Sequence, residues 1–437
     1  WEMRLWDAFL SIVPPLLLGW LALSVPAGRR AWLWKLAFSV WMFVFIAQGP
    51  IYAPLVIAAI GVVLALRLRS LALAGLLVAA SAYYASICRY TWTYAPGLWA
   101  GMLALLALEK PTLHFNQWKR LLRPVILGLC GYAGGELLPD IIKWISSGGQ
   151  GGAVTLMLDA GTAVSRQPLL WDRLWPNSTF APGIMLATLW ATLPVVVLLV
   201  WLVARCIWRL NVLQLLAASG VTLAFLAVGL VASVKIGGGS NLHNLDMFWL
   251  TLGMLVANAL PALFPRVEGS LAVPGWATAV ILSVALVFPV TYTVAYGEPL
   301  GLPPADMVQE ALTKVQEQVA QAGQSGEVLF IDQRQLVTFG LVPPVPFIAD
   351  YEKKYMMDKA MASDADYFEA FHSDLARQRF ALIITEPVRV NYISDSERSF
   401  VEENNAWVSW VSAPLLTYYQ PLETYEQVGV QILVPKK

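Results

Sequence analysis

Long apolar runs alternate with short polar connections through the first 296 residues of the chain. The longer runs reach the roughly 20 residues that a helix needs to cross a bilayer. We predict about ten spans, several of which are tilted, broken or re-entrant because they are shorter than that length. The expected spans are Phe9–Val25, Trp32–Ala47, Ile51–Leu66, Leu71–Ile87, Gly97–Leu108, Pro124–Leu138, Ile184–Val203, Val212–Val234, Met247–Leu263 and Trp276–Tyr296.

After Tyr296 the pattern becomes that of a water-soluble domain. Strand patterns alternate with helical patterns there, which is typical of a small, mostly parallel sheet with covered faces. The expected elements are a helix over 304–322, one or two helices over 351–377, and strands at Glu327–Asp332, Arg379–Thr385 and Val428–Val434. The predicted fold is therefore a polytopic α-helical membrane bundle over 1–296, followed by a small extracytoplasmic α/β domain over 297–437.

Composition and charge support this division. The chain is 58% hydrophobic and 13% charged, which is far too apolar for an ordinary soluble domain. Of its 29 basic and 29 acidic residues, 11 bases and 20 acids follow Tyr296, which leaves 18 bases and 9 acids before it. The membrane part thus carries about +9 and the tail about −9. Neither GxGxxG nor GxxxxGK[ST] follows a predicted strand, so nucleotide binding has no local support in the sequence. We also expect no nucleic-acid partner.

Lysine and arginine gather in every second connection between the spans, beginning with Arg29 and Arg30. Basic connections of this kind stay in the cytoplasm. The Tyr90–Tyr94 loop, the segment Ile141–Pro182, the stretch Lys235–Asp246 and the C-terminal domain then lie on the outer side of a cytoplasmic (inner) membrane. The unusual polar residues of the chain are thereby expected on one face.

The densest polar cluster of the apolar part runs from Ser233 to Asp246, at the mouth of a span. Ionisable groups there are costly to desolvate and indicate a functional site. Lysine neutralises phosphate, glycine amides cradle an anion, and amide and imidazole groups bond sugar hydroxyls. We assign these roles to Lys235, to Gly237 and Gly238, and to Asn241, His243 and Asn244, with Asp246 orienting His243 or a metal. The alternative is that these residues only cap the following helix.

Two further outer segments carry candidate binding residues. Arg89 lies in an aromatic loop and either snorkels at the interface or binds a lipid phosphate. The segment 141–182 contains Leu169, Leu170, Trp171, Leu174 and Trp175, whose spacing predicts an amphipathic helix in the outer interface. That helix covers the bundle or acts as a lid that brings Arg166, Asp172 and Arg173 to the polar site.

Other chemistries have less support in the sequence. A zinc site is not favoured, because His114 and His372 lie far from His243 along the chain. An oxygen-rich site for Mg²⁺, Mn²⁺ or Ca²⁺ on Asp246, Asn241 and Asn244 stays open. Transport is not favoured either, since the span interiors are nearly free of ionisable groups, with Glu136 as the nearest exception.

The segment with Lys235, its glycines, Asn241 and His243 resembles stretches of bacterial membrane glycosyltransferases of the GT-C superfamily, relatives of protein O-mannosyltransferases and aminoarabinose transferases. The strands around Glu327–Gly340 and Arg379–Glu386 are similar to the extracytoplasmic domain of many such proteins. The resemblance implies transfer of a sugar from a polyprenyl-phosphate carrier to an acceptor outside the membrane. It also implies a catalytic carboxylate near the N-terminus as general base.

Ahead of the first span the sequence offers only Glu2 and Asp7 for that carboxylate. Asp7 is therefore the candidate base, unless the catalytic portion lies upstream of Trp1 or the chain is a non-catalytic relative. A second hypothesis is a non-enzymatic membrane subunit or scaffold that docks protein partners through the acidic domain 297–437. A third is a transferase like the O-antigen ligases, which use outer-loop arginine and histidine in place of a carboxylate base.

Overall fold

The computed structural model describes residues 2–24, 31–49, 52–108, 118–146, 166–235, 238–263, 276–296, 301–394 and 400–437. Its contacts divide the chain into two units, each with a hydrophobic core of its own. Among the described residues, 2–146 and 171–296 form the first unit, whereas 166–170 and 301–437 form the second. The short piece 166–170 joins the second unit through Gln167, which is buried and donates a hydrogen bond to Asp358 Oδ1 at 3.0 Å.

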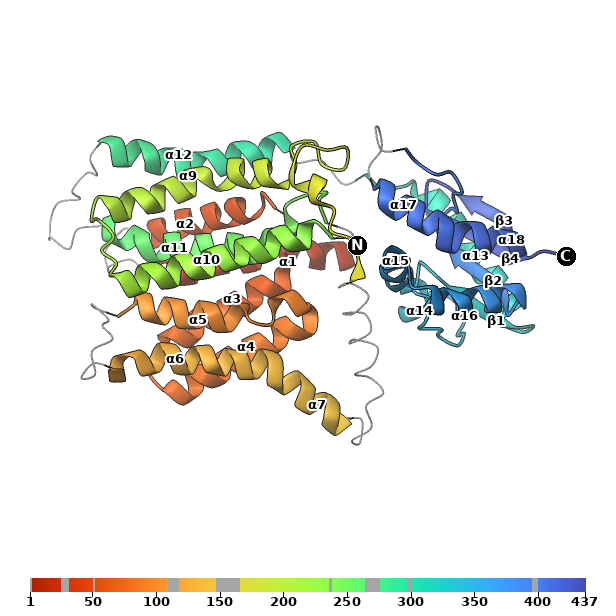
Figure 1. Ribbon diagram of the computed structural model, residues 1–437, viewed down its shortest axis with the longest axis horizontal. Coiled ribbons are helices and arrows are strands. Elements are labelled where there is room, and N and C mark those ends of the chain that lie inside the picture. Colours follow the sequence, from red (N-terminus) through yellow and green to blue (C-terminus); the bar gives the residue numbers. More distant parts are fainter. Residues whose placement is uncertain are drawn as a thin grey trace. The chain divides into compact units, whose positions relative to one another are not determined.

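The first unit is a bundle of helices that lie side by side (Figure 1). Within the described part of the chain, six helices are long and apolar enough to cross a membrane. Three further apolar helices are shorter, so ten spans remain a prediction. The helices are α1 (Glu2–Ala22), α2 (Ala31–Ile46), α3 (Ala53–Arg67), α4 (Leu71–Cys88), α5 (Ala95–Leu106), α6 (Trp118–Tyr132), α7 (Leu138–Ser146), α9 (Ile184–Ala204), α10 (Val212–Ser233), α11 (Asp246–Ala259) and α12 (Trp276–Tyr296).

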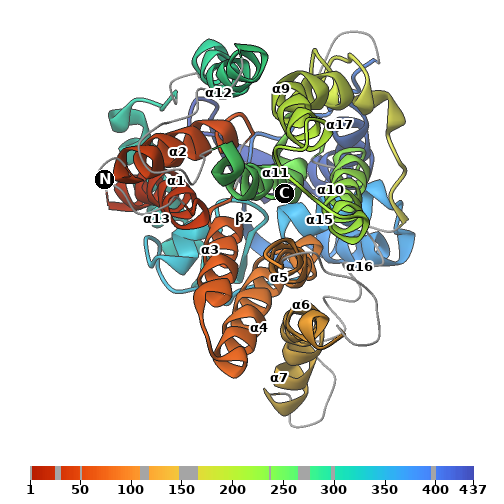
Figure 2. The ribbon, with the colours of Figure 1, turned by 90° about the vertical axis from the view of Figure 1, so that its left-hand side faces the viewer.

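Helix α11 is the centre of this bundle. It packs against α1, α2, α3, α5, α9 and α10, and Figure 2 shows it surrounded by its neighbours in the view along the bundle. All of its residues except Asn258 are buried, as expected for a helix that is apolar on every side. Whatever lies at the N-terminus of α11 is therefore held at the middle of one end of the bundle.

Glycines allow α5 and α6 to pack with their backbones almost in contact. A β-carbon added at Gly131 would lie 2.2 Å from Cα of Gly97, closer than any side chain allows. Small residues at such crossings are the usual means by which membrane helices approach one another. This contact fixes α5, and with it the connection that precedes α5, relative to the rest of the bundle.

The second unit has a four-stranded sheet with the order β1-β2-β4-β3. Helix α13 (Ala305–Ala322) packs on one face, where Val328 and Leu382 point, and α15, α16 and α18 pack on the other face, where Leu329 and Ile383 point. The strands are β1 (Glu327–Phe330), β2 (Phe380–Thr385), β3 (Tyr419–Tyr425) and β4 (Val430–Pro435). The other helices are α14 (Gln335–Thr338), α15 (Lys353–Met361), α16 (Ala365–Ala376), α17 (Val401–Trp407) and α18 (Ala413–Tyr418).

The structure differs from the expected local structure in three places. The sheet is mixed, because only β1 and β2 are parallel, while β2 with β4 and β3 with β4 are antiparallel. Strand β3 was missed, because Gln420, Pro421 and Glu423 interrupt the apolar alternation of an edge strand. The expected amphipathic helix over 169–175 is one 3-10 turn, η4 (Trp171–Leu174), whose Arg173 and Leu174 are buried.

Candidate functional site

Three connections that are far apart in the sequence meet at the N-terminus of α11. They precede α3, link α4 to α5, and link α10 to α11. Tyr52 from the first packs edge-on against His243 of the third, and Arg89 and Trp92 of the second bond side chains of the third. His243, Asn244 and Asp246 of the 233–246 stretch are thus brought together with the aromatic loop. That this face lies outside the membrane stays a prediction.

The guanidinium of Arg89 is the centre of this cluster. Its Nη2 donates a hydrogen bond to Asn244 Oδ1 at 2.6 Å, and its Nη1 lies 3.5 Å from Asp246 Oδ2. The rings of Tyr52 and Trp92 lie 5.9 Å and 5.6 Å from the guanidinium carbon. Nη1 is buried and makes no hydrogen bond to the described residues, so it meets Asp246 as an ion pair only. The Arg89 side chain as a whole is 29% exposed and lies inside an aromatic frame.

Asp246 is the anion that holds the cluster together. Its carboxylate is 1% exposed, and it accepts hydrogen bonds from Trp92 Nε1 and from the Met247 amide, both at 2.7 Å. A carboxylate at the first turn of a helix is also stabilised by the helix dipole. These contacts make Asp246 a positioning residue for Arg89 and Trp92.

The glycine-rich turn before the cluster is held by Arg173. This side chain is 1% exposed, and its Nη1 donates to the carbonyl oxygen of Gly238 at 3.2 Å and approaches that of Lys235 at 3.5 Å. Gly239 has a φ of 75°, which favours glycine, and a β-carbon there would meet the stem of Arg173 at 2.6 Å. Arg173 therefore shapes the turn from within, and Lys235 stands half-buried at its start.

Asn241 and His243 form a local pair on the same stretch. Asn241 Oδ1 accepts a hydrogen bond from the His243 backbone amide at 2.9 Å and contacts the His243 ring nitrogen Nδ1. This pairing orients the imidazole beside Tyr52. Both side chains are partly exposed, so they are within reach of a ligand.

The remaining candidates stand apart from these contacts. Asp172 is exposed in η4, and Asp7 is exposed in the second turn of α1, where no hydrogen bond or ion pair to the described residues is found for it. Arg166 is exposed and belongs to the second unit. Gly237 lies outside the described residues. Sequence reasoning missed Tyr52, whose only signal is an aromatic residue at the start of an apolar run.

The described residues contain no group of three His, Cys, Asp or Glu side chains that could hold a metal ion. Asp246 faces the Arg89 guanidinium rather than other oxygen ligands. An Mg²⁺ or Mn²⁺ ion on Asp246, Asn241 and Asn244 would have to displace that cation from Asn244 and Asp246.

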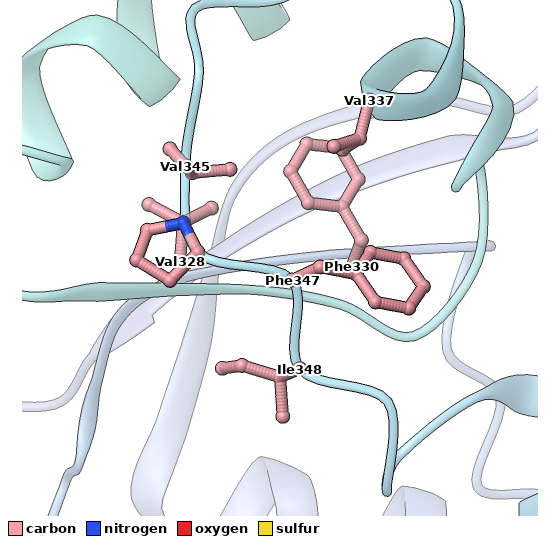
Figure 3. A pocket seen from close by; sticks show the side chains of 7 residues that line it. Val328, Phe330, Val337, Val345, Phe347 and Ile348 are labelled. Carbon is pink, nitrogen blue, oxygen red and sulfur yellow. The ribbon is translucent and has the colours of Figure 1, made fainter. Parts of the chain in front are cut away.

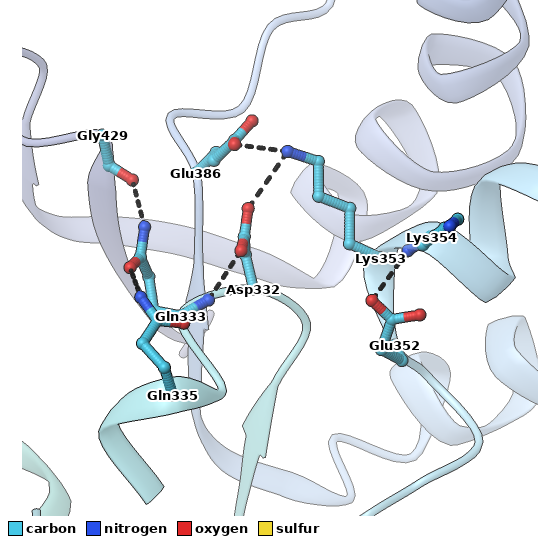
Figure 4. Close-up of polar contacts among 8 residues, drawn as sticks. All are labelled: Asp332, Gln333, Gln335, Glu352, Lys353, Lys354, Glu386 and Gly429. Carbon is cyan, nitrogen blue, oxygen red and sulfur yellow. Dashed lines mark hydrogen bonds and ion pairs between the residues drawn. The ribbon is translucent and has the colours of Figure 1, made fainter. Parts of the chain in front are cut away.

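A second polar cluster lies at the carboxyl ends of the parallel strands in the second unit (Figure 4). Lys353 Nζ lies 3.0 Å from Asp332 Oδ2 and also contacts Glu386 Oε1. Asp332 follows β1 and Glu386 follows β2, while Lys353 begins α15. Each of these charges has a partner, so the cluster ties the ends of two strands to a helix.

Substitution Asp332→Asn should flatten the acid dependence of stability in the second unit. Partial burial acts to raise the pKa of Asp332, but hydrogen bonding that involves Glu386, the Gln333 amide and Lys353 outweighs it and lowers this pKa. The stabilisation is therefore present above the ordinary value of about 3.9 and is lost as the pH falls below it. Calorimetry from about pH 2 to about pH 5 should show a shallower slope for the variant. An unchanged slope would contradict this role of Asp332.

No protein-family model matches this chain, and no curated protein or solved structure is significantly similar to it. The class that the fold defines is a helical membrane protein with an additional α/β unit. What the cluster around Arg89 does has to be argued from its own chemistry.

Proposed function

We propose that the cluster around Arg89 binds a polyprenyl-phosphate sugar, and that the protein transfers the sugar to an acceptor on the outer side of the cytoplasmic membrane. The observation that carries this proposal is the arginine itself. The Arg89 guanidinium lies beside the rings of Tyr52 and Trp92, is held by Asn244 and Asp246, and belongs to a side chain that is 29% exposed. Such a group suits a phosphate that arrives on an apolar chain.

The neighbouring side chains fit the rest of such a ligand. Lys235 adds a second cation on the same stretch of chain, and Asn241 and His243 are partly exposed groups that can bond sugar hydroxyls. In the transfer, the acceptor oxygen bonds to the anomeric carbon while the bond from that carbon to the carrier phosphate breaks. Negative charge stays on the departing phosphate, where Arg89 and Lys235 stabilise it.

The proton of the acceptor hydroxyl needs a separate base. Asp246 is buried and already bonded to Trp92 and Met247, so we assign it to positioning. Asp7 is exposed in α1, a helix that packs against α11, and it remains the proposed general base.

Substitution Lys235→Ala should weaken the binding of polyprenyl phosphate by roughly tenfold to a hundredfold, because a charge-assisted contact contributes about 1.5–3 kcal/mol. Lys235 is half-buried in a turn, so the fold should persist. Binding is measured by native mass spectrometry or calorimetry on the full chain in nanodiscs. The matched control is Lys119→Ala, which removes an exposed cation at the start of α6.

Sugar transfer is tested separately, with the same protein and a radiolabelled lipid-linked sugar. Asp7→Asn should then reduce turnover while leaving the affinity for polyprenyl phosphate unchanged. If Lys235→Ala and Lys119→Ala bind the lipid equally well, the proposed site is wrong. If purified protein binds no polyprenyl phosphate and instead co-purifies with stoichiometric partner proteins, a membrane scaffold is the better description.

A further inference from the structure

An uncharged loop of the second unit presents apolar side chains to its surroundings. This loop, residues 335–349, begins with the single helical turn α14 and contains no charged residue, although the rest of the unit is rich in them. Phe339, Leu341 and Phe347 are 57%, 43% and 58% exposed. Three large exposed apolar side chains within nine residues of an uncharged segment favour an interaction site over isolated surface positions.

The loop is held in a defined shape. Arg334 donates hydrogen bonds to the carbonyl oxygens of Phe330 and Ile348, at 2.8 Å and 2.7 Å, and so joins the two ends of the loop. Gln316 of α13 donates to the carbonyl oxygen of Leu341 at 2.7 Å. A loop whose ends are tied in this way presents its exposed side chains without further ordering, which lowers the entropy lost on binding.

The inner side of the same loop packs on the sheet. With Val328 and Phe330 of β1, residues Val337, Val345–Phe347 and Ile348 line a cavity of about 10 Å³, room for one water molecule (Figure 3). Phe347 borders this cavity and is also 58% exposed. The guanidinium of Arg334 lies 4.7 Å from the Phe347 ring and covers one of its faces. The cavity is too small for an organic ligand, so the exposed outer side is where a partner would bind.

The short connection between α12 and α13 keeps the second unit near any bilayer that surrounds the first unit. Helix α12 ends at Tyr296 and α13 begins at Ala305, so residues 297–304 span at most roughly 30 Å even when fully extended. Helix α12 contains the apolar stretch Ala279–Thr291 and packs in the first unit, whose helices have the length and composition of membrane spans. A bilayer around those helices would therefore be present near the second unit at a high effective concentration.

We propose that the loop 335–349 inserts Phe339, Leu341 and Phe347 into the interfacial region of the bilayer. The second unit would then contact the membrane through its own side chains as well as through its connection to α12. The net charge of about −9 after Tyr296 opposes attraction to anionic lipid. Burial of apolar side chains is therefore the driving force, and added salt should not release the loop. This inference goes beyond the proposed transferase activity and does not depend on it.

The test uses the full chain in nanodiscs with a fluorescent reporter on a single cysteine. The native thiols are replaced by Cys88→Ser, Cys130→Ala and Cys206→Ser, and an environment-sensitive dye is attached at Leu341→Cys. The nanodiscs contain zwitterionic lipid with or without a nitroxide quencher near the headgroup. We expect a blue-shifted emission and strong quenching by the nitroxide lipid, both retained at high salt.

The matched control places the dye at Glu369→Cys, an exposed position on α16 of the same unit, where we expect neither effect. Adding Phe339→Glu to the Leu341→Cys protein should remove the blue shift and the quenching, because a charge in the interface opposes insertion. Equal quenching at 341 and 369, or no quenching at either, would overturn the proposal. A blue shift at 341 without quenching would also overturn it, since it would indicate an apolar partner other than lipid.

Discussion

Substitution Arg89→Ala is expected to destabilise the first unit by about 3–5 kcal/mol, because it leaves the buried carboxylate of Asp246 without its cation. Asp246 is 1% exposed, and its nearest cation is the Arg89 guanidinium at 3.5 Å. Its two remaining hydrogen bonds, from Trp92 and Met247, come from neutral donors. Scanning calorimetry or thermal unfolding of the full chain in detergent measures the effect.

Substitution of the other partner of the ion pair, Asp246→Asn, should destabilise the first unit less, by about 1–3 kcal/mol. Arg89 is 29% exposed and retains its hydrogen bond to Asn244, so water can solvate the cation that remains. The double variant Arg89→Ala, Asp246→Asn should be more stable than the sum of the single effects predicts, because neither partner is then left charged and unpaired. Additive effects would show that the two charges do not interact.

The ion pair between Arg89 and Asp246 also limits which variants can test the proposed lipid site. A variant that loses Arg89 is expected to be less stable, so weaker lipid binding by Arg89→Ala would not by itself identify a ligand contact. Lys235 avoids this difficulty because it is only half-buried. Arg89→Lys adds a useful comparison, since it keeps the charge opposite Asp246 but cannot bind phosphate through two parallel hydrogen bonds.

Much of the fold follows from the sequence because it depends on periodicity and composition. The apolar runs give most helices of the first unit, although α6 begins before its expected span and α7 was not predicted. The alternation after Tyr296 gives β1, β2, β4, α13, α15 and α16 close to their observed bounds. The pairing of the strands was not predictable in the same way. The direction of β4 in the sheet depends on the antiparallel hairpin that β3 and β4 form. Strand β3 carries mostly polar, exposed residues, so its sequence lacks the apolar alternation that would reveal the hairpin.

The site was predicted in part for a similar reason. The cost of placing polar groups beside a span identifies the 233–246 stretch. The loop around Arg89 is recognised in the sequence by its many aromatic residues. The sequence does not show that Arg89 bonds Asn244 and Asp246, since those residues are more than 150 positions away. It also does not show that Arg173 is buried under the glycine turn, because the neighbouring pattern resembled an exposed amphipathic helix.

Substitution Gly131→Leu should destabilise the first unit by at least about 3 kcal/mol and weaken lipid binding together with stability. The β-carbon alone would lie 2.2 Å from Cα of Gly97 and 2.7 Å from its backbone nitrogen. Neither atom can move without displacing the backbone of α5. Because α5 begins directly after the turn that carries Trp92, a shift of α5 changes the frame around Arg89 as well. Thermal unfolding in detergent and polyprenyl-phosphate binding measure the two effects on one sample.

Comparing Gly131→Ala with Gly131→Leu shows whether steric contact with α5 causes the loss of stability. Gly131→Ala should already be destabilising, since the contact arises at the β-carbon, and Gly131→Leu should be worse. The control is Gly220→Ala in α10, where an added β-carbon meets no other atom within 4 Å. In a helix interior that change should be neutral or stabilise the protein by up to about 1 kcal/mol. If Gly131→Ala unfolds at the same temperature as Gly220→Ala, the backbones of α5 and α6 are farther apart than the structure shows, and the fixed position of the Arg89 loop loses its explanation.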